Sequence, residues 1–266
     1  ILLGPYAAFL TIASVLVVQA LFFADGGLLA LGCNIFNLGF FPSFVAYPLI
    51  YKPLAGTRPN SGRILAAALC SAVAGLQFGA FAVVLQTVLS GVSALPFGTF
   101  TLMMQPIHLA IGIVEGLVTA AVVTFVWKAR PEVLSAKPLT GVSLRQVLCG
   151  LTVAAVITGG VLSWFASSHP DGLEWSIARV TGAEEGVAAP ETPLHRSLPR
   201  VQEKSALLPD YGFKATGEAG HETSGGGVAD AGTSVSGLVG GLLTLVLALL
   251  GGVALKVVAR RRKPRS

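Results

Sequence analysis

The sequence has few charged residues for its length. Asp, Glu, Lys and Arg make up 12% of its 266 residues, whereas a soluble domain carries about a quarter. Hydrophobic residues make up 53% and the mean hydropathy is +0.74. This balance is not that of an ordinary soluble domain, and it predicts a chain that lies largely within a lipid bilayer.

Recognisable catalytic motifs are also missing. The sequence has no Walker phosphate loop, no dinucleotide-binding glycine fingerprint, no His-Glu-x-x-His and no Gly-x-Ser-x-Gly. Its three cysteines, Cys33, Cys70 and Cys149, show neither metal-ligand nor thioredoxin spacing. We expect them to be small buried hydrophobic residues. We therefore expect no enzyme, no catalytic residue and no permanently bound cofactor.

What the sequence does contain is a series of long apolar runs. A helix that crosses a bilayer needs about 20 mostly apolar residues. Six segments meet this requirement, at about 6–23, 28–50, 64–90, 106–127, 147–165 and 235–258. The sequence thus predicts an all-α membrane protein, a polytopic bundle with six transmembrane helices and one long external loop.

Lysine and arginine are absent from two short links, around Asp25 and over 91–105. The other two short links and the chain end carry Lys52, Arg58, Arg63, Lys128, Arg130, Lys137, Arg145, Lys256, Arg260, Arg261, Arg262, Lys263 and Arg265. Short basic links lie in the cytoplasm, so we expect these segments and the C-terminus there. The net charge of +5 then reflects membrane topology, not nucleic-acid binding.

A change in composition divides the chain. Residues 1–130 are predicted to form a compact bundle with short links, and 131–145 a cytoplasmic linker. Residues 146–266 are predicted to form a helix–loop–helix hairpin whose external loop covers about 167–234. Within it, 215–236 is rich in Gly, Ser and Thr and is expected to be flexible.

Four polar side chains in the predicted spans are candidates for function, because polar groups are costly in lipid. Glu115 lies near the middle of the fourth span, where it locks helices together or takes part in transport. His108 is two turns earlier on the same face, about 10 Å away along the axis. It is an interfacial hydrogen-bonding residue or a group at a metal site. Asn34 and Asn37 share a face of the second span, where they pair helices or line a cavity.

The first half of the chain resembles a known family. The run 19–34, Gln-Ala-Leu-Phe-Phe-Ala-Asp-Gly-Gly-Leu-Leu-Ala-Leu-Gly-Cys-Asn, is similar to the CbiM/NikM family, as is the helix around Glu115-Gly116-Leu117. That family supplies the substrate-capture subunits of energy-coupling-factor transporters for cobalt and nickel. The resemblance covers about residues 1–130.

The second half resembles the NikN/CbiN-like accessory module. Its signature is Pro170-Asp171-Gly172-Leu173-Glu174, and its second motif is Leu208-Pro209-Asp210-Tyr211. In that module, two helices flank an external loop, which agrees with the predicted hairpin. We expect the loop 167–234 to steady the capture site.

One departure concerns the metal ligands. The resemblance implies that an N-terminal Met-His pair and a histidine of a later external loop hold the metal, and neither occurs in this chain. The chain is expected to begin after both, so its metal ligands would lie upstream and none is assigned here. Asn34, Asn37, His108 and Glu115 remain candidates for lining a cavity or supporting a ligand.

The resemblance implies the substrate-specific membrane subunit of an ATP-driven energy-coupling-factor importer of nickel or cobalt in a prokaryotic cell membrane. Its partners would be the bilayer, a transmembrane coupling subunit and cytoplasmic ATPase subunits, with no nucleic acid. Ni(II) or Co(II) would be cargo. The alternatives are a non-transporting membrane scaffold or assembly subunit and, third, a membrane enzyme that uses Glu115 and His108.

Overall fold

The computed structural model describes residues 1–91, 95–130, 143–165, 171–182, 193–213 and 231–261. Every regular element in these ranges is helical, which confirms the all-α prediction. The elements are α1 (Pro5–Val18), η1 (Gln19–Phe23), α2 (Leu31–Ile35), η2 (Phe36–Tyr51), α3 (Lys52–Ala55), α4 (Ser61–Ser90), α5 (Phe97–Ala129), α6 (Leu144–Gly160), η4 (Leu162–Phe165), α7 (Gly172–Thr181), α8 (Pro193–Ser205), η5 (Pro209–Tyr211) and α9 (Ala231–Arg261).

Among the described residues, five helical segments are long and apolar enough to cross a membrane. They are Pro5–Phe23, Leu31–Ala55, Ser61–Ser90, Phe97–Ala129 and Ala231–Val258. They coincide with five of the six predicted spans, although the helix α5 begins at Phe97, well before the expected 106. The chain is thus a multi-pass helical membrane protein.

The span predicted at 147–165 requires a correction. The helix α6 has 17 residues and ends at Gly160, and the chain continues in the 3₁₀ turn η4. Glycine is a poor helix former, and this end is held by side chains. Ser234 donates a hydrogen bond to the Gly160 carbonyl at 2.6 Å, and the Trp164 indole donates to Ser234 at 2.5 Å. The helix α6 is therefore shorter than the other spans.

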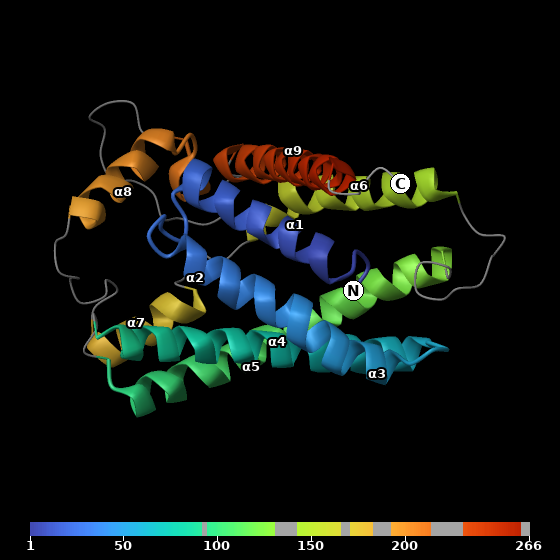
Figure 1. The fold of residues 1–266 in the computed structure, drawn as a ribbon, viewed down its shortest axis with the longest axis horizontal. Helices are drawn as coiled ribbons and strands as arrows, with labels where there is room; N and C mark the ends of the chain where they lie inside the picture. Colours follow the sequence, from blue (N-terminus) through green and yellow to red (C-terminus); the bar gives the residue numbers. More distant parts are fainter. Residues whose placement is uncertain (92–94, 131–142, 166–170, 183–192, 214–230, 262–266) are drawn as a thin grey trace. The chain divides into compact units, whose positions relative to one another are not determined.

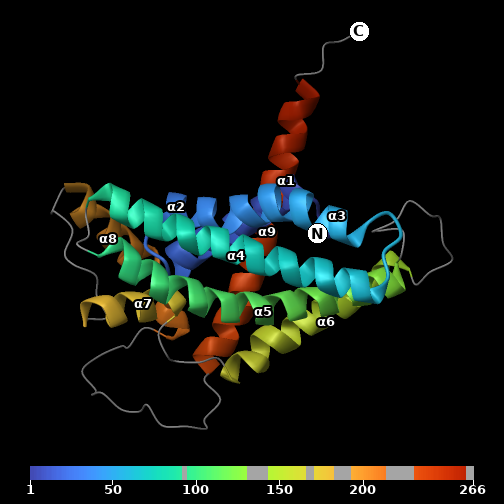
Figure 2. The ribbon, with the colours of Figure 1, turned by 90° about the horizontal axis from the view of Figure 1, so that it is seen from below.

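The described residues form two compact units. Unit 1 comprises Ile1–Ile12, Gly32–Leu148 and Ser168–Thr192, and unit 2 comprises Ala13–Leu31, Cys149–Ser167 and Pro193–Ser266. In unit 1, α4 and α5 run side by side, η2 packs on α4, and α7 lies along α5 (Figures 1 and 2). In unit 2, η1 and η5 contact each other, and both contact α9.

Glycines four residues apart bring the helices of unit 1 together. A Cβ atom on Gly79 of α4 would lie 2.8 Å from the Asn37 carbonyl oxygen, and Gly75 sits against Pro42. On α5, a Cβ on Gly116 would lie 2.8 Å from the Leu69 Cα atom. In lipid, the hydrophobic effect does not drive helices together, so their association depends on close packing. Contacts through small residues make this close packing possible.

The prediction that the cysteines are buried was wrong, since Cys33, Cys70 and Cys149 are all exposed. Many large apolar residues are exposed as well, for example Leu102 at 65% and Leu242 at 61%. The physical reason is the solvent: in a bilayer, an apolar side chain gains nothing by turning away from the lipid. Small residues occupy much of the interior instead, including Ala67, Ala68 and Ala80.

The predicted external loop 167–234 is more ordered than expected. Its described parts contain the helices α7 and α8 and the turn η5. Of the stretch 215–236 that we expected to be flexible, 231–236 belongs to α9, which corrects that expectation, and 215–230 lies outside the described residues. The predicted linker 131–145 lies mostly outside them too.

Candidate functional site

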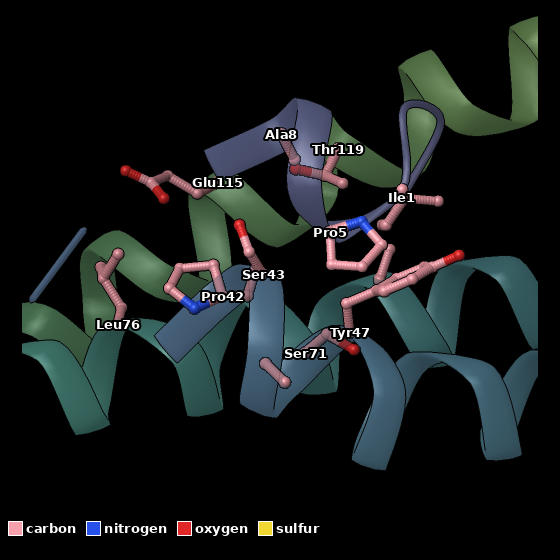
Figure 3. Close-up of a pocket in the computed structure, with 14 residues that line it drawn as sticks. Ile1, Pro5, Ala8, Pro42, Ser43, Tyr47, Ser71, Leu76, Glu115 and Thr119 are labelled. Carbon is pink, nitrogen blue, oxygen red and sulfur yellow. The ribbon is translucent and has the colours of Figure 1, made fainter. Parts of the chain in front are cut away.

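Unit 1 contains a pocket that includes Glu115, one of the candidate residues, in its lining. It encloses about 220 Å³ and is lined by α1, η2, α4 and α5. Its polar lining residues are Ser43, Tyr47, Ser71, Glu115 and Thr119. Figure 3 shows Ser43 between Glu115 at one end and Tyr47 at the other. The walls are otherwise apolar, so this pocket places a few oxygen atoms within the membrane-spanning part of the chain.

Glu115 lines this pocket, as a functional carboxylate in a span would be expected to do. Its side chain is exposed, and in Figure 3 the carboxylate points away from Tyr47. The neighbouring Gly116 presses α5 against α4. Glu115 therefore lies beside one of the tight helix contacts of unit 1, at the edge of the pocket.

His108 does not line the pocket. Its Nδ1 atom lies 2.8 Å from the Met104 carbonyl oxygen. Because a carbonyl oxygen only accepts, Nδ1 carries the proton and donates. The other side of the ring faces Gly172 at the start of α7, where a Cβ atom would lie 3.0 Å from the His108 Cε1 atom. The structure thus places His108 at a helix contact.

The two asparagines lie in different surroundings. Asn37 is 2% exposed and exchanges two hydrogen bonds with Gln86 of α4, at 2.8 and 3.0 Å. This is the helix-pairing role that the sequence left open. Asn34 is half-buried in α2 and is not among the residues that line the pocket.

The Asn37–Gln86 pair should be worth about 1 kcal/mol, the usual size of a hydrogen bond between membrane helices. Asn37→Ala and Gln86→Ala are each expected to lower the thermal unfolding midpoint in detergent. The double variant should be hardly worse than either single variant, because the two residues lose the same interaction. Additive losses would show that the two amides act independently.

The first accessory motif starts α7 and packs inside unit 1. The Asp171 side chain accepts from the backbone N–H groups of Leu173 and Glu174, both at 2.8 Å, and Glu174 accepts from the Asp171 N–H. This capping box fixes the first turn. Leu173 then packs on the core cluster that contains Phe100 and Met104. Pro170 lies outside the described residues.

The second accessory motif lies in unit 2, where Pro209, Asp210 and Tyr211 form a single 3₁₀ turn. Asp210 and Tyr211 both have positive φ angles, 49° and 61°. The Tyr211 hydroxyl donates to the Asp25 carboxylate, and its ring stacks on Phe23 with centroids 4.9 Å apart. The motif thus contacts the very run, 19–34, that resembles the CbiM/NikM family.

Burial and, next, the hydrogen bond to Asp25 raise the pKa of Tyr211 to about 12, although the hydrogen bond from Gln19 acts in the opposite direction. A phenol ionises with more difficulty away from water and beside a carboxylate. Its O–H group therefore remains a donor throughout the physiological pH range. The sequence pointed to Tyr211 only through the motif, and it indicated Gln19 only weakly, as a polar residue at the start of the run 19–34.

The described residues contain no group of three or more His, Cys, Asp or Glu side chains that could hold a metal ion. Of the two titratable candidates in α5, Glu115 lines the pocket of unit 1, whereas His108 contacts the start of α7. The chemistry of the described side chains therefore does not favour a particular metal.

Comparisons with known proteins match the two halves of the chain to two different families. Residues 1–133 match the CbiM family, described as the cobalt uptake substrate-specific transmembrane region, and residues 145–257 match the PDGLE domain. A protein of Archaeoglobus fulgidus that carries the name NikMN is 30% identical over 98% of this chain and 75% of its own length.

Other relatives carry transport names as well. The fused nickel transport protein NikMN of Rhodobacter capsulatus is 30% identical over 79% of this chain and 67% of its own length. The cobalt transport protein CbiM of Sorangium cellulosum is 28% identical over 50% of this chain and 60% of its own. No solved structure matches significantly. The chain therefore belongs to the CbiM family of nickel and cobalt transport proteins, with a PDGLE domain joined to it as in the fused NikMN proteins.

Proposed function

We propose that this chain is the substrate-specific membrane subunit of an ATP-driven importer of nickel or cobalt ions. The observation that carries the proposal is its similarity, over nearly its whole length, to a protein named NikMN. Membrane-spanning helices and a family defined by cobalt uptake support it. The reaction is vectorial movement of an ion, so no catalytic residue is assigned.

Energy has to come from partner subunits, because the sequence offers no phosphate-binding loop. We propose that cytoplasmic ATPases act through a transmembrane coupling subunit, as in energy-coupling-factor transporters. The basic short links and the basic C-terminal tail favour a cytoplasmic C-terminus. This orientation puts α7, α8 and η5 on the outside, where the ion arrives.

The bundle of residues 1–130 would pass the ion, and the hairpin of 146–266 would act as the accessory module. Glu115, at the edge of the unit 1 pocket, is the candidate group on the ion's route. Asn34, Asn37 and His108 are supporting candidates, of which Asn37 and His108 act through helix packing. We assign no metal ligand to this chain, and nickel or cobalt is the cargo, not a resident cofactor.

The test is uptake of radioactive nickel or cobalt by cells that lack their own importer. Cells that express the full-length protein with its ATPase and coupling subunits are expected to accumulate the ion well above background. An ATPase variant unable to hydrolyse ATP is expected to abolish accumulation. A scaffold or assembly subunit would leave accumulation at background in both strains, and that result would refute the proposal.

Removing 170–213 from the full-length protein should also lower uptake. The deletion, however, does not distinguish loss of the motifs from loss of core packing. Leu173, Ile177 and Val180 of α7 pack on the core of unit 1, so the deletion exposes apolar surface as well as removing a motif. Single substitutions within the motifs separate these two effects.

A further inference from the structure

The link between the first two spans is a tight turn with an unusual backbone. Ala24 has φ 58°, and the two glycines that follow Asp25 have φ 80° and 59°. A residue with a side chain is disfavoured in this left-handed region. The Asp25 N–H donates to the Gln19 carbonyl at 3.1 Å. Such a turn keeps its shape only when surrounding contacts determine it.

The segment 207–211 supplies these contacts. The N–H groups of Leu207 and Leu208 both donate to the Phe22 carbonyl, at 3.0 and 3.1 Å. Phe22 is in the last turn of η1, where backbone carbonyls have no partner further along the helix. A segment nearly two hundred residues away in sequence thus satisfies the end of the first span.

Side chains complete the connection. The Tyr211 hydroxyl donates to Asp25 Oδ2, and Gln19 Nε2 donates both to that oxygen, at 3.2 Å, and to the Tyr211 hydroxyl, at 3.1 Å. All three groups are partly buried. Hydrogen bonds to a carboxylate in such a place are among the strong ones.

Two further hydrogen bonds, from α8 and α9, connect to the turn and to Tyr211. Gln202 of α8 accepts from the Leu28 N–H at 3.3 Å. Ser236 of α9 donates to the Tyr211 carbonyl at 2.9 Å. Tyr211 therefore joins the turn at Asp25 to the first part of the last span.

We propose that Tyr211 is a positioning residue for transport, which with Gln19 and Asp25 locks the turn between the first two spans in its ion-competent position. In the proposed orientation this turn faces the outside. The inference rests on the proposed function, because it assigns the lock to the step in which the importer takes up its ion. The three groups that form the lock are the Tyr211 hydroxyl, the Asp25 carboxylate and the Gln19 side-chain amide.

The test is Tyr211→Phe in the full-length protein, co-expressed with its partner subunits. Phenylalanine keeps the ring stacked on Phe23 and removes only the hydroxyl. Losing one hydrogen bond to a charged group should shift the equilibrium between the locked and the released turn by about tenfold or more. The apparent affinity falls by up to the same factor, and by less when the locked turn is the main state to begin with. We therefore expect the KM for nickel or cobalt uptake to rise about fivefold to tenfold, with the saturating rate nearly unchanged.

Three comparisons separate positioning from a merely structural role. Loss of folded protein would lower the saturating rate and leave KM as it is. Tyr6→Phe, which deletes an equivalent hydroxyl from a side chain that is 81% exposed, should leave both values unchanged. Because the pKa of Tyr211 is about 12, the hydroxyl stays protonated, and the ratio of the two KM values should be constant between about pH 6 and pH 9.

Hydrogen exchange gives a readout that does not depend on transport. Tyr211→Phe should speed amide exchange over residues 25–31 in lipid nanodiscs, and Asp25→Asn should do the same if the first variant accumulates poorly. Wild-type protein without any uptake would refute the proposed function. Wild-type uptake together with an unchanged KM in Tyr211→Phe, or unchanged exchange over 25–31, would overturn the lock alone.

Discussion

Gly116→Val is expected to force α5 away from α4 and to destabilise unit 1 strongly. A Cβ atom at Gly116 would lie 2.8 Å from both Cα and Cδ1 of Leu69. The clash involves backbone, so no rotamer change relieves it. Overpacking of this kind typically costs about 1–3 kcal/mol, and we place Gly116→Val at the upper end.

The measurement is thermal unfolding in detergent, with the folded fraction in membranes as a second readout. Gly98→Val is the matched control, since Gly98 lies in the same helix and a Cβ there has nothing within 4 Å. For a chain of this size, about 1 kcal/mol corresponds to about 2–4 °C. Gly116→Val should therefore melt several degrees below Gly98→Val, and equal midpoints would contradict the close α4–α5 contact.

Gly172→Val is expected to displace α7 and to reduce metal uptake about tenfold, the factor that corresponds to about 1.4 kcal/mol. A Cβ on Gly172 would lie 3.0 Å from His108 Cε1 and 3.3 Å from Ile111 Cδ1. The His108 ring cannot swing aside freely, because its Nδ1 atom bonds to the Met104 carbonyl. The new side chain therefore pushes α7 outward and uncovers the core against which Leu173 packs.

A second substitution shows whether His108 is the cause. His108→Ala removes two of the three nearest atoms, so the double variant Gly172→Val with His108→Ala should regain part of the lost uptake. His108→Ala alone, with α7 in place, should have a smaller effect than Gly172→Val. If the double variant transports no better than Gly172→Val, His108 supports the ion's route directly and not through α7.

Several features of the fold could be predicted from local sequence. Five spans were placed correctly because about 20 consecutive apolar residues have only one low-energy solution in lipid, a helix that satisfies its own backbone. The predicted end of the sixth span was wrong, because the helix α6 already ends at Gly160. Gly159 and Gly160 weaken the helix there, and Ser234 of α9 caps it. That cap comes from 74 residues away in sequence, so no local pattern contains it.

The sequence identified the candidate residues but not their contacts, because these contacts involve residues that are distant in sequence. Glu115, His108, Asn34 and Asn37 stood out because polar groups are conspicuous in apolar runs. Nothing in the runs themselves showed that Asn37 pairs with Gln86, or that His108 is covered by α7. Cys33, Cys70 and Cys149 were wrongly expected inside because, in lipid, apolar character does not distinguish the interior from the surface.

By itself, the sequence determined that the chain enters the membrane as helices, approximately where five of the long helices lie, and which motifs it carries. These properties follow from composition and from interactions within a few residues. Only the tertiary structure decided that the accessory motifs meet the transporter half, with Gly172 against His108 and Tyr211 on Asp25. Tyr211 and Asp25 are separated by 186 positions, and contacts of that kind exist only once the helices have packed.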